Sequence, residues 1–582
     1  MAAAMEPVSS RDLECRKICV ERFIYAILYS VAAQYLLLTV FLLLVNFSLL
    51  HPVVWILGSF RLLLSLSTWL WIMPLVSAVI VHGIFLAKAY LSASSYCPTR
   101  FQLLYRTLIQ KSVLLLINCV IGFLTGWLYT RFLRDDYRLL FLNTDKGLSV
   151  LNEKFLFLLL GGTFAGVYFF VKNNRTVDDK ASFVSFPVIQ QPRYQQIRAN
   201  LYSIVYHSMF KSFVPTLIYV SFFYTFCCLY FRYKLAALFQ GTVLAEESFL
   251  GAFYTTVSDV RLVVYCWILS SQVLSNMNLM QVLFHIFLTE YRTFPVEKST
   301  ISNDAEVSLV EALACDKIPI VQQLAALDLF TIADSCDVSR RIRLYALSIP
   351  GGHPYNWRIV SGECIRLIRE FTNELSKSME GATPKVHPEV SKLRPTASMD
   401  AEKILMKQYN ESFGIRSLST TVPPNNAIPP SQPDVICKTI DRKLDSLRQT
   451  LRNIPGIFYL FGEPKAAKTC YLLSSQSQQM IWISQALGSL AAHSIREDQF
   501  GVVQNDLPLI IRTLLQLKQV VDKVGSIQLD MKKVDRRYVA LKAATKRSLY
   551  RIAHAFADYL NDIVLDPNDV KALQGFVSYR EI

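Results

Sequence analysis

The first half of the chain contains six long apolar runs that hold no Asp, Glu, Lys or Arg. They are residues 23–50, 62–87, 112–130, 155–171, 212–231 and 262–289. A helix of about 20 apolar residues crosses the roughly 30 Å hydrocarbon core of a bilayer. With 52% hydrophobic residues over 582 positions, the composition excludes an ordinary soluble protein. The sequence therefore predicts an all-α, polytopic membrane protein with six transmembrane helices followed by a cytosolic helical domain.

The fourth run, residues 155–171, is the shortest of the six and contains Gly161, Gly162 and Gly166. Glycine on a membrane helix lets the backbone of a neighbouring helix come close, because no side chain separates the two. We therefore expect this run to make a tight helix contact inside the bundle.

Lys and Arg near the ends of the runs predict the orientation of the chain. With the N-terminus in the cytosol, the cytosolic segments carry 14 of these cations and the opposite segments carry nine, as the positive-inside rule requires. Residues 1–22 and the tail after residue 289 should then face the cytosol. The net charge of +15 is spread around the runs and along helices, which favours attraction to a membrane surface over direct nucleic-acid binding.

Few side chains within the runs are suited to chemistry. Only His82 and His285 could titrate there, and both lie near run ends, so no ion or proton path is indicated. The sixth run also carries a polar cluster, which we interpret as interhelical hydrogen bonding, with a transport cavity as the alternative. Its members are Ser270, Ser271, Gln272, Ser275, Asn276 and Asn278. The rival hypothesis is therefore a transporter or membrane enzyme of the endoplasmic reticulum.

The tail shows no pattern typical of a catalytic, cofactor or metal site. The 12 cysteines are scattered without zinc-ligand spacing, and His353 has no acid, nucleophile or metal ligand beside it. Residues 462–469 (GEPKAAKT) approximate a phosphate-binding loop, but Ala467 stands where such a loop needs a second glycine. A nucleotide switch through Lys468 is a distant third hypothesis.

Composition divides the tail into three parts. For residues 290–377 we predict a membrane-proximal helical block with a break at Pro319. For residues 378–434 we predict a disordered linker, since eight of the 23 prolines fall there. Residues 435–582 predict a C-terminal helical domain. One of its helices should cover residues 506–524 with Asp506 as N-cap. Another should cover residues 535–564, either packed in the domain, which we favour, or lying on the membrane.

Three stretches of the sequence are more specific than these patterns. They are residues 348–357 (SIPGGHPYNW), 497–508 (EDQFGVVQNDLP) and 186–191 (FPVIQQ). Together they resemble the nuclear division cycle (Ndc) family of transmembrane nucleoporins of animals, along nearly the whole chain. The main departure is the linker, which is shorter than in vertebrate members. The resemblance implies a structural or docking role for Pro350, Gly351, Gly352, His353, Pro354, Asn356, Trp357, Phe500 and Gly501.

The resemblance also implies a function. Members are non-enzymatic pore membrane proteins that anchor the nuclear pore complex in the nuclear envelope and support its assembly. Both termini would lie on the cytosolic and pore side, and the tail would dock soluble nucleoporins. The implied partners are aladin, the membrane-binding inner-ring nucleoporins and other pore membrane proteins, with no cofactor and no direct nucleic-acid contact. Phe-Gly pairs occur only at Phe413, Phe461 and Phe500, which is typical of a scaffold and not of a permeability barrier.

Overall fold

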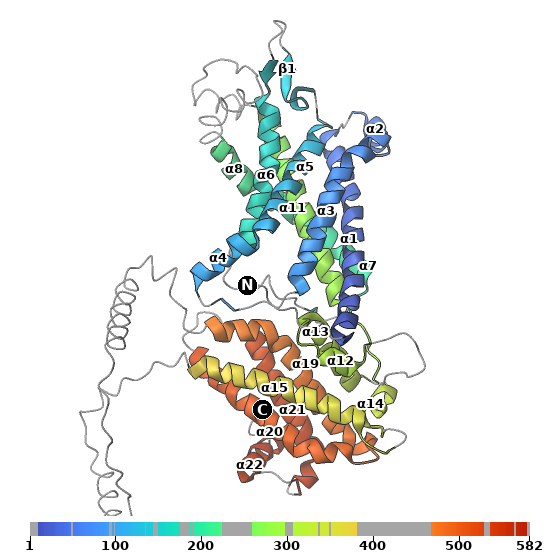
Figure 1. The fold of residues 1–582 in the computed structure, drawn as a ribbon, viewed down its shortest axis with the longest axis vertical. Helices are drawn as coiled ribbons and strands as arrows, with labels where there is room; N and C mark the ends of the chain where they lie inside the picture. Colours follow the sequence, from blue (N-terminus) through green and yellow to red (C-terminus); the bar gives the residue numbers. More distant parts are fainter. Residues whose placement is uncertain are drawn as a thin grey trace, which may run out of the picture.

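Two helical parts follow one another along the long axis of the molecule, as Figure 1 shows for the computed structural model. The structure describes residues 10–47, 50–91, 96–97, 99–133, 135–143, 149–174, 186–187, 190–223, 259–296, 307–335, 338–347, 351–380, 467–528, 536–560, 562–563 and 566–578. Helices from the first half of the chain form a bundle, and helices from the second half form a tail domain against one end of it. We call this the tail end of the bundle and the opposite end the far end.

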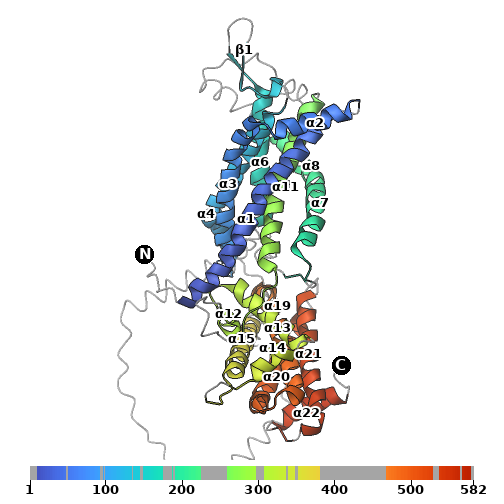
Figure 2. The ribbon, with the colours of Figure 1, turned by 90° about the vertical axis from the view of Figure 1, so that its right-hand side faces the viewer.

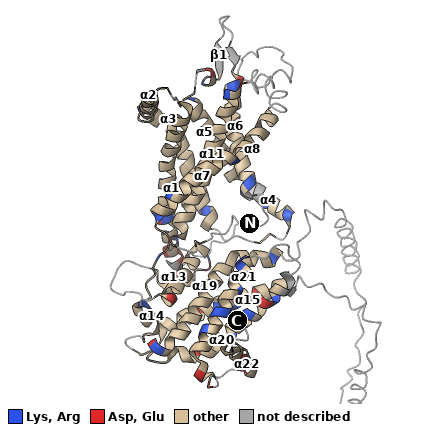
Figure 3. Ribbon diagram, turned by 180° about the vertical axis from the view of Figure 1, so that it is seen from behind, with Lys and Arg blue, Asp and Glu red and all other residues tan. Residues whose placement is uncertain are grey.

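Five described helices are long and apolar enough to cross a membrane. They are α1 (Ser10–Val45), α3 (Leu66–Leu91), α5 (Ser112–Thr130), α6 (Glu153–Asn174) and α11 (Val260–Thr289). Figure 3 shows that Lys and Arg in this part lie mostly near the ends of the helices. The predicted class, an all-α polytopic membrane protein followed by a helical region, is confirmed.

The fifth predicted run, residues 212–231, lies only partly within the described residues. The helices found there are α7 (Arg193–Lys211) and α8 (Phe213–Phe222). The break between them is explained by Pro215, which cannot donate the helical hydrogen bond to the carbonyl of Lys211. Residues 224–258 lie outside the described part, so the count of six membrane helices stays a prediction.

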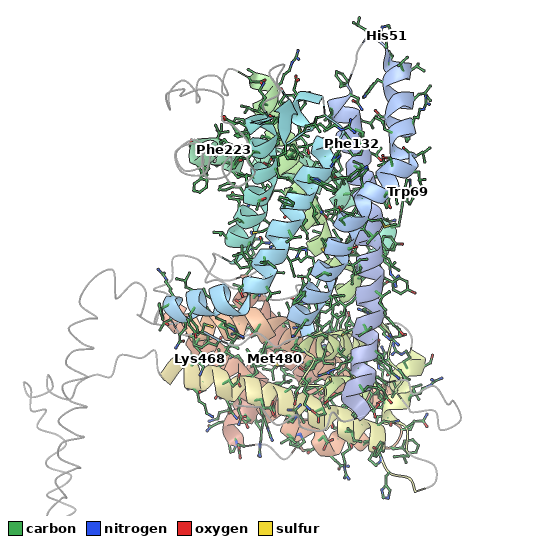
Figure 4. The ribbon with its side chains drawn as sticks, turned by 45° about the horizontal axis from the view of Figure 1, so that its top comes forward. His51, Trp69, Phe132, Phe223, Lys468 and Met480 are labelled. Carbon is green, nitrogen blue, oxygen red and sulfur yellow. The ribbon has the colours of Figure 1, made fainter. Side chains whose placement is uncertain are left out.

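Two ion pairs show at which end of the bundle the chain lies before and after residues 194–258. At the tail end, Arg193 forms an ion pair with Glu290, directly after α11. At the far end, Lys154 pairs with Asp259, directly before α11, at 2.9 Å. Figure 4 labels Phe223, next to the end of α8, toward the far end. The chain has therefore passed from the tail end to the far end between Arg193 and Asp259, which favours an odd number of crossings there.

Short elements lie between the long helices. They are α2 (Pro52–Leu63), η1 (Asp135–Tyr137), β1 (Phe141–Asn143) and β2 (Ser149–Leu151) at the far end and α4 (Arg100–Gln110) at the tail end. The two strands pair antiparallel, with Phe141 opposite Leu151. Strands of three residues are too short to produce an alternating pattern, which is why the all-α prediction did not include this hairpin.

Helices α5 and α6 approach each other at glycines. A Cβ added at Gly162 would lie 2.4 Å from the carbonyl oxygen of Gly122, and one at Gly166 would lie 2.3 Å from the carbonyl oxygen of Asn118. Both distances are too short for a real side chain. The tight contact predicted for this run is confirmed, with α5 as its partner.

The tail domain is built from helices of both predicted blocks. They are α12 (Leu309–Leu313), α13 (Pro319–Asp334), α14 (Val338–Tyr345), α15 (Tyr355–Glu380), α19 (Ala467–Glu497), α20 (Val502–Gln528), α21 (Arg536–Ala555), η3 (Ala557–Tyr559) and α22 (Pro567–Val577). Helix α13 packs on α19, and α15 packs on both α19 and α20. The predicted break at Pro319 is confirmed, since this residue opens α13. Helix α15 ends at Glu380, slightly beyond the predicted boundary at residue 377, and residues 381–466 lie outside the described part.

The predicted start of the helix at residue 506 is wrong. Helix α20 begins at Val502, because Asp498 caps it by accepting a hydrogen bond from the backbone N–H of Val503 at 2.9 Å. Asp506 therefore lies inside the helix, and its carboxylate is available for a distant partner.

The predicted helix at residues 535–564 is shorter than expected. Helix α21 ends at Ala555, and a 3-10 turn follows. Leu541, Leu549 and Ile552 are buried against the rest of the domain, whereas Tyr559 is exposed. Because α21 packs on α19 and α20, it is a helix of the tail domain, as we favoured.

Candidate functional site

Two of the three specific stretches, residues 348–357 and 497–508, lie against each other in the tail domain. Trp357 is buried, and its indole Nε1 donates a hydrogen bond to a carboxylate oxygen of Asp506 at 3.0 Å. Ser361, one turn further along α15, donates to the same oxygen at 3.3 Å. We call this place the motif junction. The expected helix cap, Asp506, is in fact the acceptor that joins the two stretches.

The turn before Trp357 depends on two glycines. Gly351 has a φ of 123° and Gly352 a φ of 62°, and residues with a Cβ rarely adopt such values. The backbone N–H of Arg358 then donates to the carbonyl of Pro354 at 3.0 Å, which is the first helical bond of α15. Pro350 lies outside the described residues. The Gly-Gly pair thus lets the chain reverse and insert Trp357 into the domain.

Helix α14 holds the start of α15 in place. The side-chain amide of Asn356 donates to the carbonyl of Arg343 at 3.3 Å. The rings of Tyr345 and Trp357 lie 5.8 Å apart, and the hydroxyl of Tyr345 donates to the carbonyl of Leu490 in α19 at 3.0 Å. Burial raises the pKa of Tyr345, so its hydroxyl keeps the proton that it donates.

The turn between α19 and α20 presents Phe500 to solvent. Asp498 accepts from the backbone N–H of Phe500 at 3.1 Å, in addition to its bond with Val503. Gly501 has a φ of 65°, which again suits glycine. This backbone holds the Phe500 side chain outward, where it is 59% exposed.

A buried ion pair closes the junction. Arg341 of α14 donates to both carboxylate oxygens of Glu497, at 2.8 and 2.9 Å, and it also donates to the carbonyl of Ser335. A bidentate pair of this kind fixes both distance and orientation. It ties the end of α19, and with it the Phe500 turn, to α14.

The residues around the motif junction that remain exposed, which we call the junction face, combine apolar groups with cations. It consists of Ile342, Arg343, Tyr355, Arg358, Arg496 and Phe500, all exposed in the structure. The acidic residues of the same segments are engaged internally, as described above for Glu497, Asp498 and Asp506. The three arginines form no ion pair with any residue that the structure describes. The junction face is therefore both apolar and positive.

The third stretch, residues 186–191, touches the tail domain as well. Phe186 lies in the connection after α6 and packs edge-on against Trp482 of α19, with ring centroids 5.3 Å apart. In the connection after α3, Tyr96 lies 5.4 Å from Tyr471, also of α19. Figure 4 labels Met480 and Lys468, which mark α19 below the bundle. Two connections of the bundle therefore rest on one tail helix.

A buried carboxylate fastens the exit of α11 to the tail domain. Asp328 of α13 is fully buried and accepts hydrogen bonds from the hydroxyl of Tyr291 at 2.7 Å and the backbone N–H of Phe294 at 2.9 Å. Arg340 donates to the same carboxylate at 2.8 and 3.0 Å, and to the carbonyl of Phe294. We call this group the Asp328 clamp. Burial and the bond to Asp328 raise the pKa of Tyr291 to about 12, so the hydroxyl stays a donor at neutral pH.

Sequence reasoning missed Asp328 and Trp482. The signal at Asp328 is an acid in the middle of the apolar helix 319–334, and buried acids are rare unless paired. Its partners Tyr291 and Arg340 lie 37 and 12 positions away, beyond the spacing of helical neighbours, so the pairing itself left no local pattern.

Two members of the polar cluster in the sixth run, Asn276 and Asn278, make contacts between helices. Gln34 of α1 donates to the side-chain oxygen of Asn276 at 2.6 Å, and Asn278 donates to the hydroxyl of Ser208 in α7 at 3.1 Å. These bonds join α11 to two neighbours, as the interhelical interpretation predicts. His82 is buried within α3.

The structure adds no support for a metal site or for a nucleotide-binding loop among the residues that it describes. Within the described ranges, no group of three or more His, Cys, Asp or Glu side chains is placed to hold a metal ion. Residues 462–466 of the loop that resembles a phosphate site lie outside the described part, and Ala467 is the first residue of α19.

Fold and junction together define a class: a polytopic membrane protein whose helical domain is fastened to one end of its membrane bundle. Comparison with known proteins identifies the family within this class. A family model described as nucleoporin protein Ndc1-Nup matches residues 17–574, and the chain belongs to this Ndc1 family of nucleoporins.

Relatives match over almost their whole length. Nucleoporin Ndc1 of Drosophila melanogaster is 34% identical over 589 aligned residues, covering 98% of this chain and 99% of that protein. Nucleoporin NDC1 of Danio rerio is 28% identical, covering 97% and 98%, and that of Homo sapiens is 25% identical, covering 96% and 97%. The resemblance drawn from the three stretches is confirmed. The chain is a membrane nucleoporin of the nuclear pore, and its family is one of pore components and not of enzymes.

Proposed function

We propose that the chain anchors the nuclear pore complex in the nuclear envelope, supports pore assembly, and docks soluble nucleoporins on its tail domain. The observation that carries this proposal is the fastening of the tail domain to the bundle. The Asp328 clamp, the Phe186–Trp482 contact and an ion pair of 2.8 Å between Lys317 and Asp12 of α1 all cross that boundary. A load applied to the tail domain is then transmitted to the membrane helices.

The proposed orientation places the tail domain on the cytosolic and pore side. The start of α1 and the tail domain lie at the same end of the bundle, since Asp12 pairs with Lys317. The distribution of cations supports the cytosol for that end. Both termini are then on the side where soluble nucleoporins assemble.

The junction face is the proposed docking surface for these nucleoporins. Exposed aromatic side chains beside arginines are typical of residues that dominate protein interfaces, and here Phe500, Tyr355 and Arg358 supply them. A partner segment that offers apolar and acidic side chains would match its chemistry. Aladin, the membrane-binding inner-ring nucleoporins and other pore membrane proteins are the proposed partners.

Imaging tests the proposal. A fluorescently tagged full-length chain should collect in puncta at the nuclear rim and co-purify with soluble nucleoporins. A version that ends at Glu290 should lose those soluble partners. An even spread of the full-length chain through the reticulum, without co-purified nucleoporins, would overturn the proposal.

A further inference from the structure

Helix α2 is mostly apolar, and many of its apolar side chains are exposed, which is unusual for a helix that faces water. It has 12 residues, about 18 Å of helix, which is too short to cross a bilayer core of roughly 30 Å. Figure 2 shows it lying across the long axis of the bundle at the far end. The position is therefore at one membrane boundary, on the side away from the tail domain.

One face of α2 is fixed to α1. The indole Nε1 of Trp55 donates to the carbonyl of Leu43 at 2.9 Å, and the Trp55 ring meets Phe47 edge-on at 5.1 Å. Ser59, one turn further along, is buried on the same side. These contacts set the rotation of α2 about its own axis.

The opposite face is exposed and, apart from Arg61, apolar. Residues 53, 54, 57 and 60 share that face by their helical spacing, and they are Val53, Val54, Leu57 and Phe60. Val54 is 70% exposed and Leu57 is 63% exposed. Arg61 is the single charged residue of the helix, and a long cation at such a boundary can reach the lipid headgroups.

We propose that α2 is an in-plane membrane anchor whose Val53, Val54, Leu57 and Phe60 face lies among the acyl chains of the leaflet away from the tail domain. The occupant is lipid because only two residues separate α2 from the membrane-spanning helix α3, whose first turns also expose apolar side chains, among them Leu70 and Met73. The geometry also leaves the backbone of α2 internally hydrogen-bonded, as a lipid environment demands. In the proposed orientation this is the lumenal leaflet, and only that name rests on the proposed function.

A lipid-borne label tests this on the unmodified full-length chain. The chain is reconstituted in phosphatidylcholine vesicles that contain a phosphatidylcholine with a diazirine in its acyl chain, then irradiated and analysed by peptide mass spectrometry. Label should appear on Val54 and Leu57 at roughly ten times the level on Trp55 and Ser59, as expected for a helix with one face in lipid. Leu70 of α3 provides the positive control.

Two results would overturn the anchor. The first is labelled Leu70 with unlabelled α2, and the second is equal label on both faces of α2. A cross-link between α2 and a second copy of the chain, together with absent lipid label, would assign the face to a protein contact instead. The vesicles contain no other pore component, so either failure leaves the proposed docking function untouched.

Discussion

Asp328 accepts four hydrogen bonds on one buried carboxylate, and this explains how a membrane helix can be joined firmly to the tail domain. Two of the bonds come from Tyr291 and Phe294, which directly follow α11, and two come from Arg340. A buried charge is stable only when it is paired and hydrogen-bonded. The clamp satisfies that condition with groups from both sides of the boundary.

Replacing this carboxylate should therefore weaken the tail domain. Asp328→Asn leaves Arg340 without its anionic partner, so we expect the free energy of unfolding to fall by about 3 kcal/mol. Thermal unfolding of the purified full-length chain in detergent measures the change. Asp316→Asn is the matched control, because Asp316 is an exposed acid that pairs with Arg366 at 3.0 Å, and its loss should cost less than about 1 kcal/mol. Equal effects at the two positions would contradict the role of the clamp.

The Gly-Gly turn offers a second test at this scale. At neither Gly352 nor Gly362 would an added Cβ meet an atom within 4 Å, but only Gly352 has a positive φ. Gly352→Ala should lower the free energy of unfolding by about 1 kcal/mol through backbone strain alone. Gly362→Ala, inside α15, should raise it by about 0.5 kcal/mol. Chemical denaturation of both variants checks the opposite signs, and two changes of the same sign would refute the argument.

At the scale of the elements, α5 and α6 pack so closely that only glycine fits at their contact. An added Cβ at Gly162 overlaps a backbone carbonyl, which cannot rotate away as a side chain can. Gly162→Ala should therefore destabilise the bundle by about 1–3 kcal/mol. Gly58→Ala is the control, since a Cβ there meets nothing within 4 Å. Heat-induced loss of folded chain in detergent compares them, and an unaffected Gly162→Ala variant would show that the helices separate easily.

Local sequence patterns predicted the long elements well and the junctions poorly. The uncharged runs located five membrane helices, because the absence of charge over about 20 residues is itself the physical requirement for crossing lipid. The start of α20 was misplaced, because Asp506 followed by Pro508 resembles a helix start while the true cap, Asp498, lies eight residues earlier. Nothing local distinguishes a cap from an acid that bonds a distant tryptophan.

The candidate site was predicted only in part. The stretches around Trp357 and Phe500 were singled out by resemblance, but their mutual contact depends on pairs such as Trp357 with Asp506, which lie 149 positions apart. Helix α7 was not predicted, because its polar residues and arginines exclude it from an apolar run. Helix α2 was not predicted, because Arg61 interrupts its apolar sequence and 12 residues are too few to signal a membrane helix.

Across the whole molecule, the bundle and the tail domain should behave as one body. Trp482 fixes the connection that holds Phe186, so Trp482→Ala should free that connection and cost about 3 kcal/mol or more of tail-domain stability. Hydrogen exchange of peptides that contain Phe186 should then become faster. Ile495→Ala, an exposed position of the same helix, should leave that exchange unchanged. Unaltered exchange in the Trp482 variant would mean that the connection is held by other contacts.

We propose that the bundle holds the chain in the pore membrane while the junction face binds soluble nucleoporins, and a pair of matched double variants tests both parts of this proposal. Tyr355→Ser with Phe500→Ser changes the junction face, whereas Val539→Ser with Tyr559→Ser changes exposed apolar residues of another surface. We predict that both chains stay at the nuclear rim and that only the first loses co-purified soluble nucleoporins, by roughly tenfold or more. Full retention of those partners by the Tyr355 and Phe500 variant would contradict the account.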